Sequence, residues 1–185
     1  MENKKLISQF SKKIFKCHLI MLLVSAIFTF FFGGFLHIEK PVNGYIFSGF
    51  MVVGYIFLLY SECLIEARKN FYNVNGDRTM IDYLLGVKSG LKAHAISLIY
   101  LVVLMTFYYA YKWFTVSIWL DNVSIYVYMN VIFRFFFLPF LSFFPNSDNI
   151  YLWFYLLLCI FPSIVCGISY VLGLRECKTV NDINE

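Results

Sequence analysis

Residues 67–92, ARKNFYNVNGDRTMIDYLLGVKSGLK, decide how the rest of this chain is organised. They form one long polar segment, called the connector below, between blocks of almost uninterrupted apolar sequence. Apolar runs of about 18 residues or more with few charges predict transmembrane helices. The side of the membrane on which the connector lies therefore sets the side of every other segment.

Composition points to lipid as the solvent of this protein. Of its 185 residues, 61% are hydrophobic and 14% are charged, whereas a soluble domain carries about 25% charged residues. A soluble fold of this size cannot bury so much apolar surface. The basic residues flank the apolar blocks instead of forming one face, which excludes a nucleic-acid-binding protein. We predict an all-α, polytopic membrane helix bundle whose constant partner is the lipid bilayer.

Four transmembrane helices are expected, at about residues 19–36, 44–65, 93–111 and 150–174, in one integral membrane domain covering residues 1–185. Residues 1–18 carry five lysines against one acid and have apolar residues at helical spacing. This pattern is typical of a short amphipathic helix on an anionic leaflet. We expect it to lead into the first span.

The connector contains its own helix signal. Thr79 and Asp82 have the spacing of a capping box, in which a hydroxyl residue at the N-cap is followed three residues later by an acidic one. We expect a short interfacial helix that bends near Gly86 and Gly90 into the third span. Asn75-Gly76, just before it, predicts a turn.

Residues 123–144 are apolar but contain Arg134 near their middle. If this segment crossed the bilayer, the arginine would cost about 2.5 to 3.5 kcal/mol. The C-terminal basic residues would also leave the connector's side, which weakens the positive-inside bias. We therefore predict an outer-leaflet hairpin, amphipathic helix or re-entrant segment here. With four spans, both termini and the connector lie in the cytoplasm. The protein is then expected in the inner membrane of the cell.

Four ionisable residues are expected near the inner interface: Glu62 and Glu66, one helical turn apart, together with His18 and His94. Carboxylates and imidazoles are metal ligands, but no HExxH-type signature accompanies them. We predict ordinary interfacial residues that pair with Arg68, Lys69 or Lys92, and we predict no metal site, cofactor or catalytic residue.

Small residues recur four apart on the last span, as Ser163 with Gly167 and Ser169 with Gly173. Such faces let helices approach closely, and we expect them to pack within this chain. Arg134 is expected to contact lipid headgroups by extending along the apolar surface. The five cysteines contain no C-x-x-C pair and are expected to be buried free thiols.

Two stretches, residues 68–94 (RKNFYNVNGDRTMIDYLLGVKSGLKAH) and 161–178 (FPSIVCGISYVLGLRECK), carry a resemblance to known proteins. They resemble small multi-spanning integral membrane proteins of Firmicutes-type bacteria, a group without an assigned biochemical function. The resemblance implies a bacterial inner-membrane protein in which the connector and the last span matter. It implies no catalytic residue.

Three functions are compatible with these observations. The leading hypothesis is a non-enzymatic accessory protein or subunit that binds another membrane protein, through the connector or the small-residue face of the last span. The alternative is a small transporter or transporter subunit, which should place polar groups and helix breaks near mid-membrane. Pro162 in the last span is the sequence feature that favours it. The third is a metal-dependent membrane enzyme using the four ionisable residues above.

Overall fold

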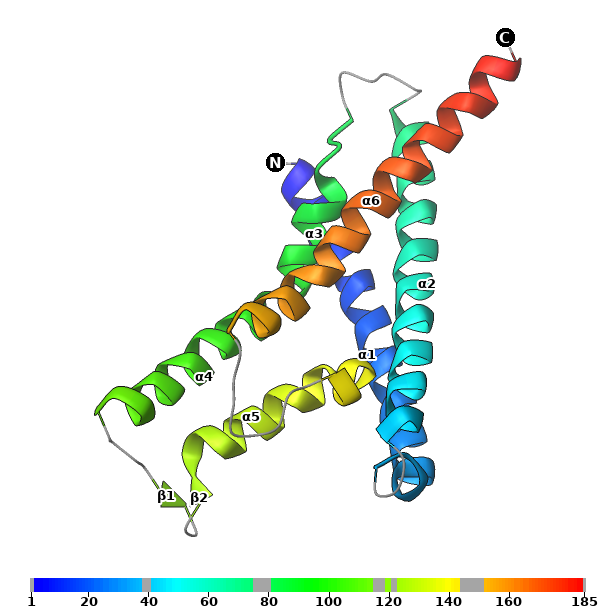
Figure 1. Ribbon diagram of the computed structural model, residues 1–185. Helices are drawn as coiled ribbons and strands as arrows, with labels where there is room; N and C mark the ends of the chain where they lie inside the picture. The colour runs from blue at the N-terminus through cyan, green and yellow to red at the C-terminus, as the bar shows by residue number, and fades with distance from the viewer. Residues whose placement is uncertain are drawn as a thin grey trace. The chain divides into compact units, whose positions relative to one another are not determined.

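The computed structural model describes residues 2–37, 41–74, 81–114, 119–120, 123–143 and 152–184 (Figure 1). Within these ranges the chain is helical apart from one pair of two-residue strands and short turns, in agreement with the prediction of an all-α fold. The elements are α1 (Glu2–His37), α2 (Pro41–Asn73), α3 (Leu85–Ala93), α4 (Ala95–Phe114), β1 (Trp119–Leu120), β2 (Val123–Ser124), α5 (Ile125–Phe136), the 3-10 helix η2 (Leu138–Phe143) and α6 (Leu152–Asn184).

Three of the described helices contain segments long and apolar enough to cross a membrane: Lys4–Phe31, Gly44–Asn73 and Trp153–Cys177. The number rises to four when α3 and α4, which are interrupted at His94, are taken as one broken span. At about 1.5 Å per residue, each of the three long segments exceeds the roughly 30 Å hydrocarbon core of a bilayer.

Two helices extend further than the sequence patterns indicate. The basic head of residues 2–18 is continuous with the first candidate span in α1, since no glycine or proline interrupts the sequence before Gly33. Helix α2 likewise runs past Ile65 to Asn73. The first residues of the connector are therefore helical, and they carry Arg68 and Lys69 on an extension of the second candidate span.

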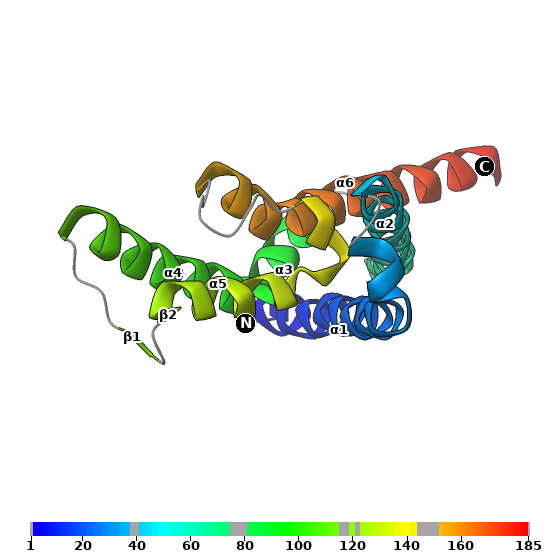
Figure 2. The same ribbon diagram turned by 60° about the horizontal axis from the view of Figure 1, so that its bottom comes forward.

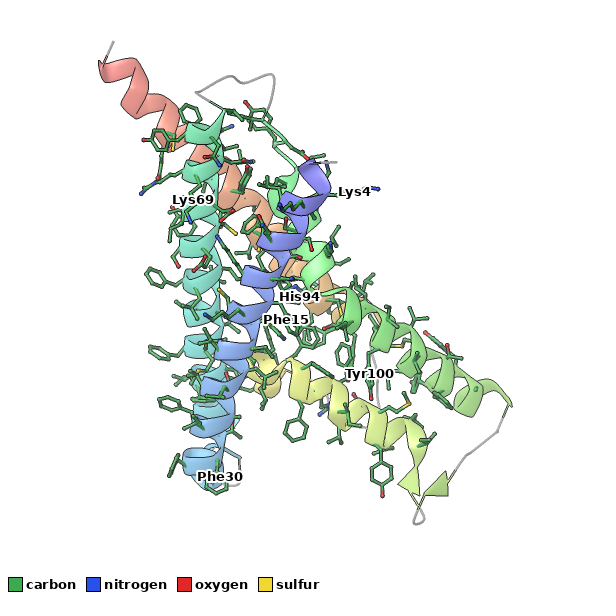
Figure 3. All side chains as sticks on the ribbon, turned by 180° about the vertical axis from the view of Figure 1, so that it is seen from behind. Lys4, Phe15, Phe30, Lys69, His94 and Tyr100 are labelled. Atoms are coloured by element: carbon green, nitrogen blue, oxygen red, sulfur yellow. The ribbon has the colours of Figure 1, made fainter. Side chains whose placement is uncertain are left out.

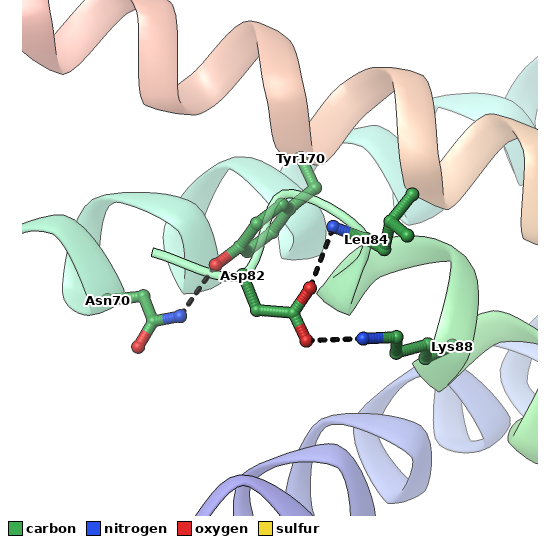
Figure 4. Close-up of polar contacts among 5 residues, drawn as sticks. All are labelled: Asn70, Asp82, Leu84, Lys88 and Tyr170. Carbon is green, nitrogen blue, oxygen red and sulfur yellow. Dashed lines mark hydrogen bonds and ion pairs between the residues drawn. The ribbon is translucent and has the colours of Figure 1, made fainter. Parts of the chain in front are cut away.

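The helix within the connector begins later than predicted. Residues 81–84 are not helical, and α3 begins at Leu85. Asp82 occupies the position before the first turn: its side chain accepts hydrogen bonds from the Leu84 backbone N–H at 3.0 Å and from Lys88 Nζ at 2.7 Å (Figure 4). The Asp82 carboxylate thus caps the start of α3 through one oxygen and binds Lys88 in its first turn through the other.

The expected bend at Gly86 and Gly90 is also wrong, because α3 is continuous through both and the interruption falls at His94. Thr79, the predicted N-cap, and the turn at Asn75-Gly76 lie outside the described residues.

The segment at 123–144 is divided. Strands β1 and β2 pair antiparallel, with Trp119 opposite Ser124, and are followed by α5 and by η2, which contains Pro139. Helix α5 has 12 residues, or about 18 Å, which is shorter than the hydrocarbon core. The length of this helix is compatible with the prediction that the segment does not span.

The chain divides into two compact units. Unit 1 comprises Met1–Leu19, Gly54–His94 and Ile160–Glu185, and unit 2 comprises Ile20–Val53 and Ala95–Cys159. Within unit 1, α3 lies between α1 and α6 (Figure 2). All five cysteines are buried and free, as predicted.

Unit 2 has an aromatic core. The ring of Phe133 on α5 is fully buried, and its centroid lies 5.1 Å from that of Tyr155 and 5.0 Å from that of Phe137. Tyr100 of α4 stacks on Phe133, and its hydroxyl donates to the Met129 carbonyl at 3.1 Å. Helices α4 and α5 are thus joined mainly through rings.

Candidate functional site

Three polar side chains from three segments of unit 1 meet in its interior. They are His18 of α1, Tyr55 of α2 and His94, which stands between α3 and α4. Only 4%, 0% and 1% of their respective surfaces are exposed. Figure 3 shows His94 where the third and fourth helices meet, close to α1. Buried ionisable side chains on apolar helices are rare and mark candidate functional sites. We call these three residues the His–Tyr–His cluster.

The Tyr55 hydroxyl connects the two imidazoles. It lies 3.0 Å from His18 Nδ1 and 3.1 Å from His94 Nε2. The imidazole rings themselves meet edge to face, with their centroids 5.0 Å apart. The other nitrogen of His94, Nδ1, lies 3.1 Å from the carbonyl oxygen of Gly90.

These contacts determine the direction of each hydrogen bond when both histidines are neutral. A carbonyl oxygen can only accept, so His94 Nδ1 donates to Gly90. His94 Nε2 then has no proton and accepts from the Tyr55 hydroxyl, whose oxygen accepts in turn from His18 Nδ1–H. The cluster is a directed chain from α1 through α2 to the end of α3.

The local sequence explains why His94 stands at a helix break. Its backbone N–H donates to the Gly90 carbonyl at 3.1 Å, and its ring donates to the same oxygen. Gly90 O therefore accepts two bonds from one residue, which closes the last turn of α3. The helix ends at Ala93 and α4 begins at Ala95.

Helix α3 is placed by two glycines that face α6. A Cβ added at Gly90 would lie 2.7 Å from Ser163 Cα, and one added at Gly86 would lie 2.5 Å from the Cys166 carbonyl oxygen. Both distances are too short for any side chain, so the two backbones approach each other closely. This packing holds α3 against α6 up to the turn before the break at His94.

The predicted metal-ligand candidates separate in the structure. His18 and His94 come together, whereas Glu66 forms an ion pair with Lys13 of α1. In the described part of the chain no group of three or more His, Cys, Asp or Glu side chains is placed to hold a metal ion. The expected ion pairs also differ, since Arg68 pairs with Glu176 at 3.1 Å.

The small residues predicted on the last span all lie in unit 1, on α6. Ser163, Gly167, Ser169 and Gly173 are buried. The neighbours found for three of them belong to α2 and α3: Gly90 for Ser163, Val87 for Gly167, and Leu64 and Ala67 for Gly173. These three positions are occupied by contacts within the chain.

Arg134, predicted to contact headgroups, belongs to unit 2. It is partly buried on α5 and acts electrostatically on Tyr155. Tyr155 donates a hydrogen bond of 2.7 Å to Oδ1 of Asn130, which is itself buried. Arg134 therefore has a partner inside the protein; the headgroup contact stays a prediction.

Sequence reasoning missed Tyr55, the central residue of the cluster. It is one of 14 tyrosines, and nothing in its immediate neighbours distinguishes it. In the structure Tyr55, Leu59, Cys63 and Ala67 follow one another at intervals of four residues and all are fully buried. The sequence did not single out this face, because residues 44–65 are apolar at almost every position. That spacing defines the inward face of α2, on which a tyrosine hydroxyl requires a partner.

Comparison of the chain with protein-family models, with curated proteins and with solved structures gave no match. The resemblance to small membrane proteins of Firmicutes-type bacteria therefore stays a prediction.

Proposed function

We propose that the protein is a non-enzymatic accessory protein or subunit of a membrane complex, inserted in a bacterial inner membrane with both termini in the cytoplasm. The observation that supports this function is that the charged and polar side chains of unit 1 contact one another. The ion pairs of Lys13 with Glu66 and of Arg68 with Glu176, like the His–Tyr–His cluster, join segments of this chain to one another. Such contacts build a rigid scaffold.

Charge distribution supports the proposed orientation. Unit 1 contains twelve Lys and Arg residues against eight Asp and Glu, a formal charge of +4, while unit 2 contains three of each. The basic head, the connector and the tail all belong to unit 1. Basic residues are enriched on the cytoplasmic side of membrane proteins, so unit 1 is proposed to face the cytoplasm.

Exposed apolar side chains provide the surface for a partner. Phe57 of α2 and Val102 of α4 are 67% and 66% exposed. In a membrane such residues contact either lipid or another protein. The small-residue face of α6 is less suited to a partner, because Val87, Leu64 and Ala67 already occupy it.

The proposal is tested by purification from native membranes in mild detergent, with a tag after Glu185 and a photo-crosslinking residue at position 57 or 102. The expected result is one stoichiometric protein that co-purifies and is crosslinked from at least one position. A crosslinker at Tyr55, which is fully buried, is the control and should capture no partner. A clean monomer or homo-oligomer would overturn the proposal.

A small transporter is the second candidate, and the His–Tyr–His cluster is the observation that favours it. Interrupted helices and buried ionisable groups coincide at the binding sites of secondary transporters. Here Gly90, one turn before the interruption at His94, closely approaches Ser163, which follows Pro162 in α6. When a proton binds His18 Nε2, His18 Nδ1 can pass its proton to the Tyr55 oxygen while the Tyr55 hydroxyl passes its own proton to His94 Nε2. His18 is then neutral, His94 carries the positive charge, and Tyr55 accepts from His94 and donates to His18 Nδ1. The cluster can therefore relay a proton.

Proteoliposomes that contain this chain alone distinguish the two candidates. A transporter is expected to move protons or a solute down an imposed pH gradient, and Tyr55→Phe should abolish the movement because phenylalanine cannot bridge the imidazoles. Tyr72→Phe, a change at an exposed tyrosine of the same helix, should leave it intact. If the wild-type protein transports no solute from a broad panel and no protons, the transporter candidate is rejected.

A further inference from the structure

Three of the five cysteines lie inside unit 1 on three different helices. They are Cys17 of α1, Cys63 of α2 and Cys166 of α6, and all three are free thiols. Cys63 and Cys166 have no exposed surface, and Cys17 is 6% exposed. The ion pairs and the His–Tyr–His cluster described above do not use these thiols, so their role is still to be assigned.

Two of the three thiols are neighbours. Cys63 and Cys166 are joined by a side-chain hydrogen bond. The helices that carry them also approach closely, because a Cβ added at Gly173 of α6 would lie 2.8 Å from Ala67 Cβ and 3.2 Å from Leu64 Cα. Leu64 follows Cys63 in α2, so the close approach includes the turn that carries this thiol. We call the two residues the Cys63–Cys166 pair.

The third thiol is a competing partner for the pair. Cys17 interacts electrostatically with Cys63, but the hydrogen bond of Cys63 is made with Cys166. Cys17 and Cys166 both act electrostatically on Tyr55. The pair therefore belongs to the same interior as the His–Tyr–His cluster, and a test has to separate Cys166 from Cys17 as the partner of Cys63.

The burial of the pair decides between two kinds of thiol chemistry. Two cysteines in contact can bind a soft cation such as Cu(I) as thiolates, or they can be oxidised to a disulfide. A monovalent cation between two thiolates leaves one net negative charge in the interior, where Glu62 and Glu66 already act on Cys63. A disulfide carries no charge, and burying an uncharged group costs far less than burying a charge. The site therefore favours the disulfide.

We propose that Cys63 and Cys166 are a redox-active pair that forms a disulfide between α2 and α6, with a small lipid-soluble disulfide as the oxidant. One cysteine attacks the oxidant as a transient thiolate, which gives a mixed disulfide and releases one thiol. The second cysteine then attacks the mixed disulfide and releases the other thiol. Both S–H bonds and the S–S bond of the oxidant break, one Sγ–Sγ bond forms, and two electrons and two protons pass to the oxidant.

The disulfide would lock α6 onto α2. About 100 residues of chain separate the two cysteines, and a crosslink over so long a loop stabilises a protein mainly by constraining its unfolded state. Unit 1 is proposed to face the cytoplasm, where thiols are kept reduced, so the dithiol is the ground state and oxidation sets the lock. This inference depends neither on a partner protein nor on transport.

Peptide mapping of the oxidised protein tests the pairing. The detergent-purified full chain is treated with dithiodipyridine, a small lipid-soluble aromatic disulfide, and the remaining thiols are alkylated. The protein is then digested for mass spectrometry without reduction. We expect one linked pair of peptides, which contain Cys63 and Cys166. We also expect Tm to rise by about 5 to 10 °C, and the lipid-soluble reductant tributylphosphine should reverse the rise.

A pair of variants on α6 separates the disulfide from general thiol modification. Cys166→Ala should lose both the linked peptides and the rise in Tm, whereas Cys177→Ala, a change at another buried free thiol of the same helix, should keep both. Thermal unfolding of the reduced proteins shows whether each variant folds, and the wild-type map is read without them. Separate thiopyridyl groups on Cys63 and Cys166, or a disulfide of either with Cys17, would overturn the proposal. An equal rise in Tm for Cys166→Ala would also overturn it.

Discussion

The two units of this chain share α1, α2 and α6 but are held together by different means. Unit 1 contains the whole formal charge of +4 and is joined by ion pairs, a buried hydrogen-bond chain and glycines at backbone contacts. Unit 2 has balanced charges and is joined mainly by aromatic rings around Phe133. Packing in unit 1 depends on glycines and on polar side chains. Packing in unit 2 depends on large aromatic side chains.

In the membrane proposed for this protein, the two kinds of packing have different sensitivities to substitution. Lipid tails are as apolar as leucine, so helices gain little from burying apolar surface, and van der Waals packing with interhelical hydrogen bonds holds them together. Close backbone approach, as at Gly86 and Gly90, maximises packing but cannot accept an extra methyl group. Ring packing, as at Phe133, tolerates small shifts but not the removal of a ring. The two units should therefore respond oppositely to changes in side-chain size.

The largest effect is expected from Gly86→Ala in unit 1. The new Cβ would lie 2.5 Å from the Cys166 carbonyl oxygen and 2.8 Å from Tyr170 Cβ, and a helix backbone cannot move aside easily. We expect a loss of about 3 kcal/mol of stability, measured by thermal unfolding in detergent. Gly49→Ala, where an added Cβ meets nothing within 4 Å, should be neutral or stabilising by up to about 1 kcal/mol. Equal Tm values for the two variants would contradict the assigned α3–α6 contact.

Phe133→Ala should have the next largest effect, a loss of stability that originates in unit 2. The change removes a fully buried ring that contacts Tyr155 and Phe137. We expect about 2 kcal/mol, below the 3–5 kcal/mol typical of soluble cores because only packing is lost in lipid. Phe135→Ala, on the same helix but 59% exposed, serves as the matched control. A larger loss from Phe135→Ala would mean that α5 faces the other way.

Tyr55→Phe tests the polar contacts of unit 1, because it removes a hydroxyl and leaves the aromatic ring in place. The variant removes the hydroxyl that lies 3.0 Å from His18 Nδ1 and 3.1 Å from His94 Nε2. Hydrogen bonds between transmembrane helices contribute about 0.6 to 1.7 kcal/mol, so a loss of about 1 kcal/mol is expected in chemical unfolding. Tyr72→Phe at an exposed site of α2 should change stability by less than that. No difference between the two would show that the cluster does not join the helices.

The smallest effect is expected at the exposed ion pair of unit 1. The side chains of Arg68 and Glu176 are 54% and 46% exposed, and such pairs contribute about 0.2 to 1 kcal/mol because water and salt screen them. Glu176→Gln should therefore lower Tm only slightly, and 1 M salt should remove the difference. A loss as large as that of Gly86→Ala would show that the tail is held more firmly than its exposure indicates.

Several features of the fold could be predicted because they depend on local sequence. Long apolar blocks predict helices whatever their neighbours are, and the three long candidate spans overlap those blocks, although Lys4–Phe31 begins in the basic head and Gly44–Asn73 runs into the connector. The boundaries were less predictable. The sequence pattern placed the start of the connector helix after Thr79 and a bend at Gly86 and Gly90, whereas α3 begins at Leu85 and is interrupted at His94. Glycine has a low helix propensity in isolation, but contact with α6 keeps both glycines helical.

The sequence by itself determined the helical class, the apolar segments long enough to span a membrane, the uneven charge and the free cysteines. Each of these follows from composition or from the spacing of residues within one helix. Only the tertiary structure decided that Tyr55 stands between His18 and His94, and that the last span packs its glycines against α2 and α3. The spacing of residues shows which face of a helix is apolar, but the register between two helices depends on how their side chains fit together.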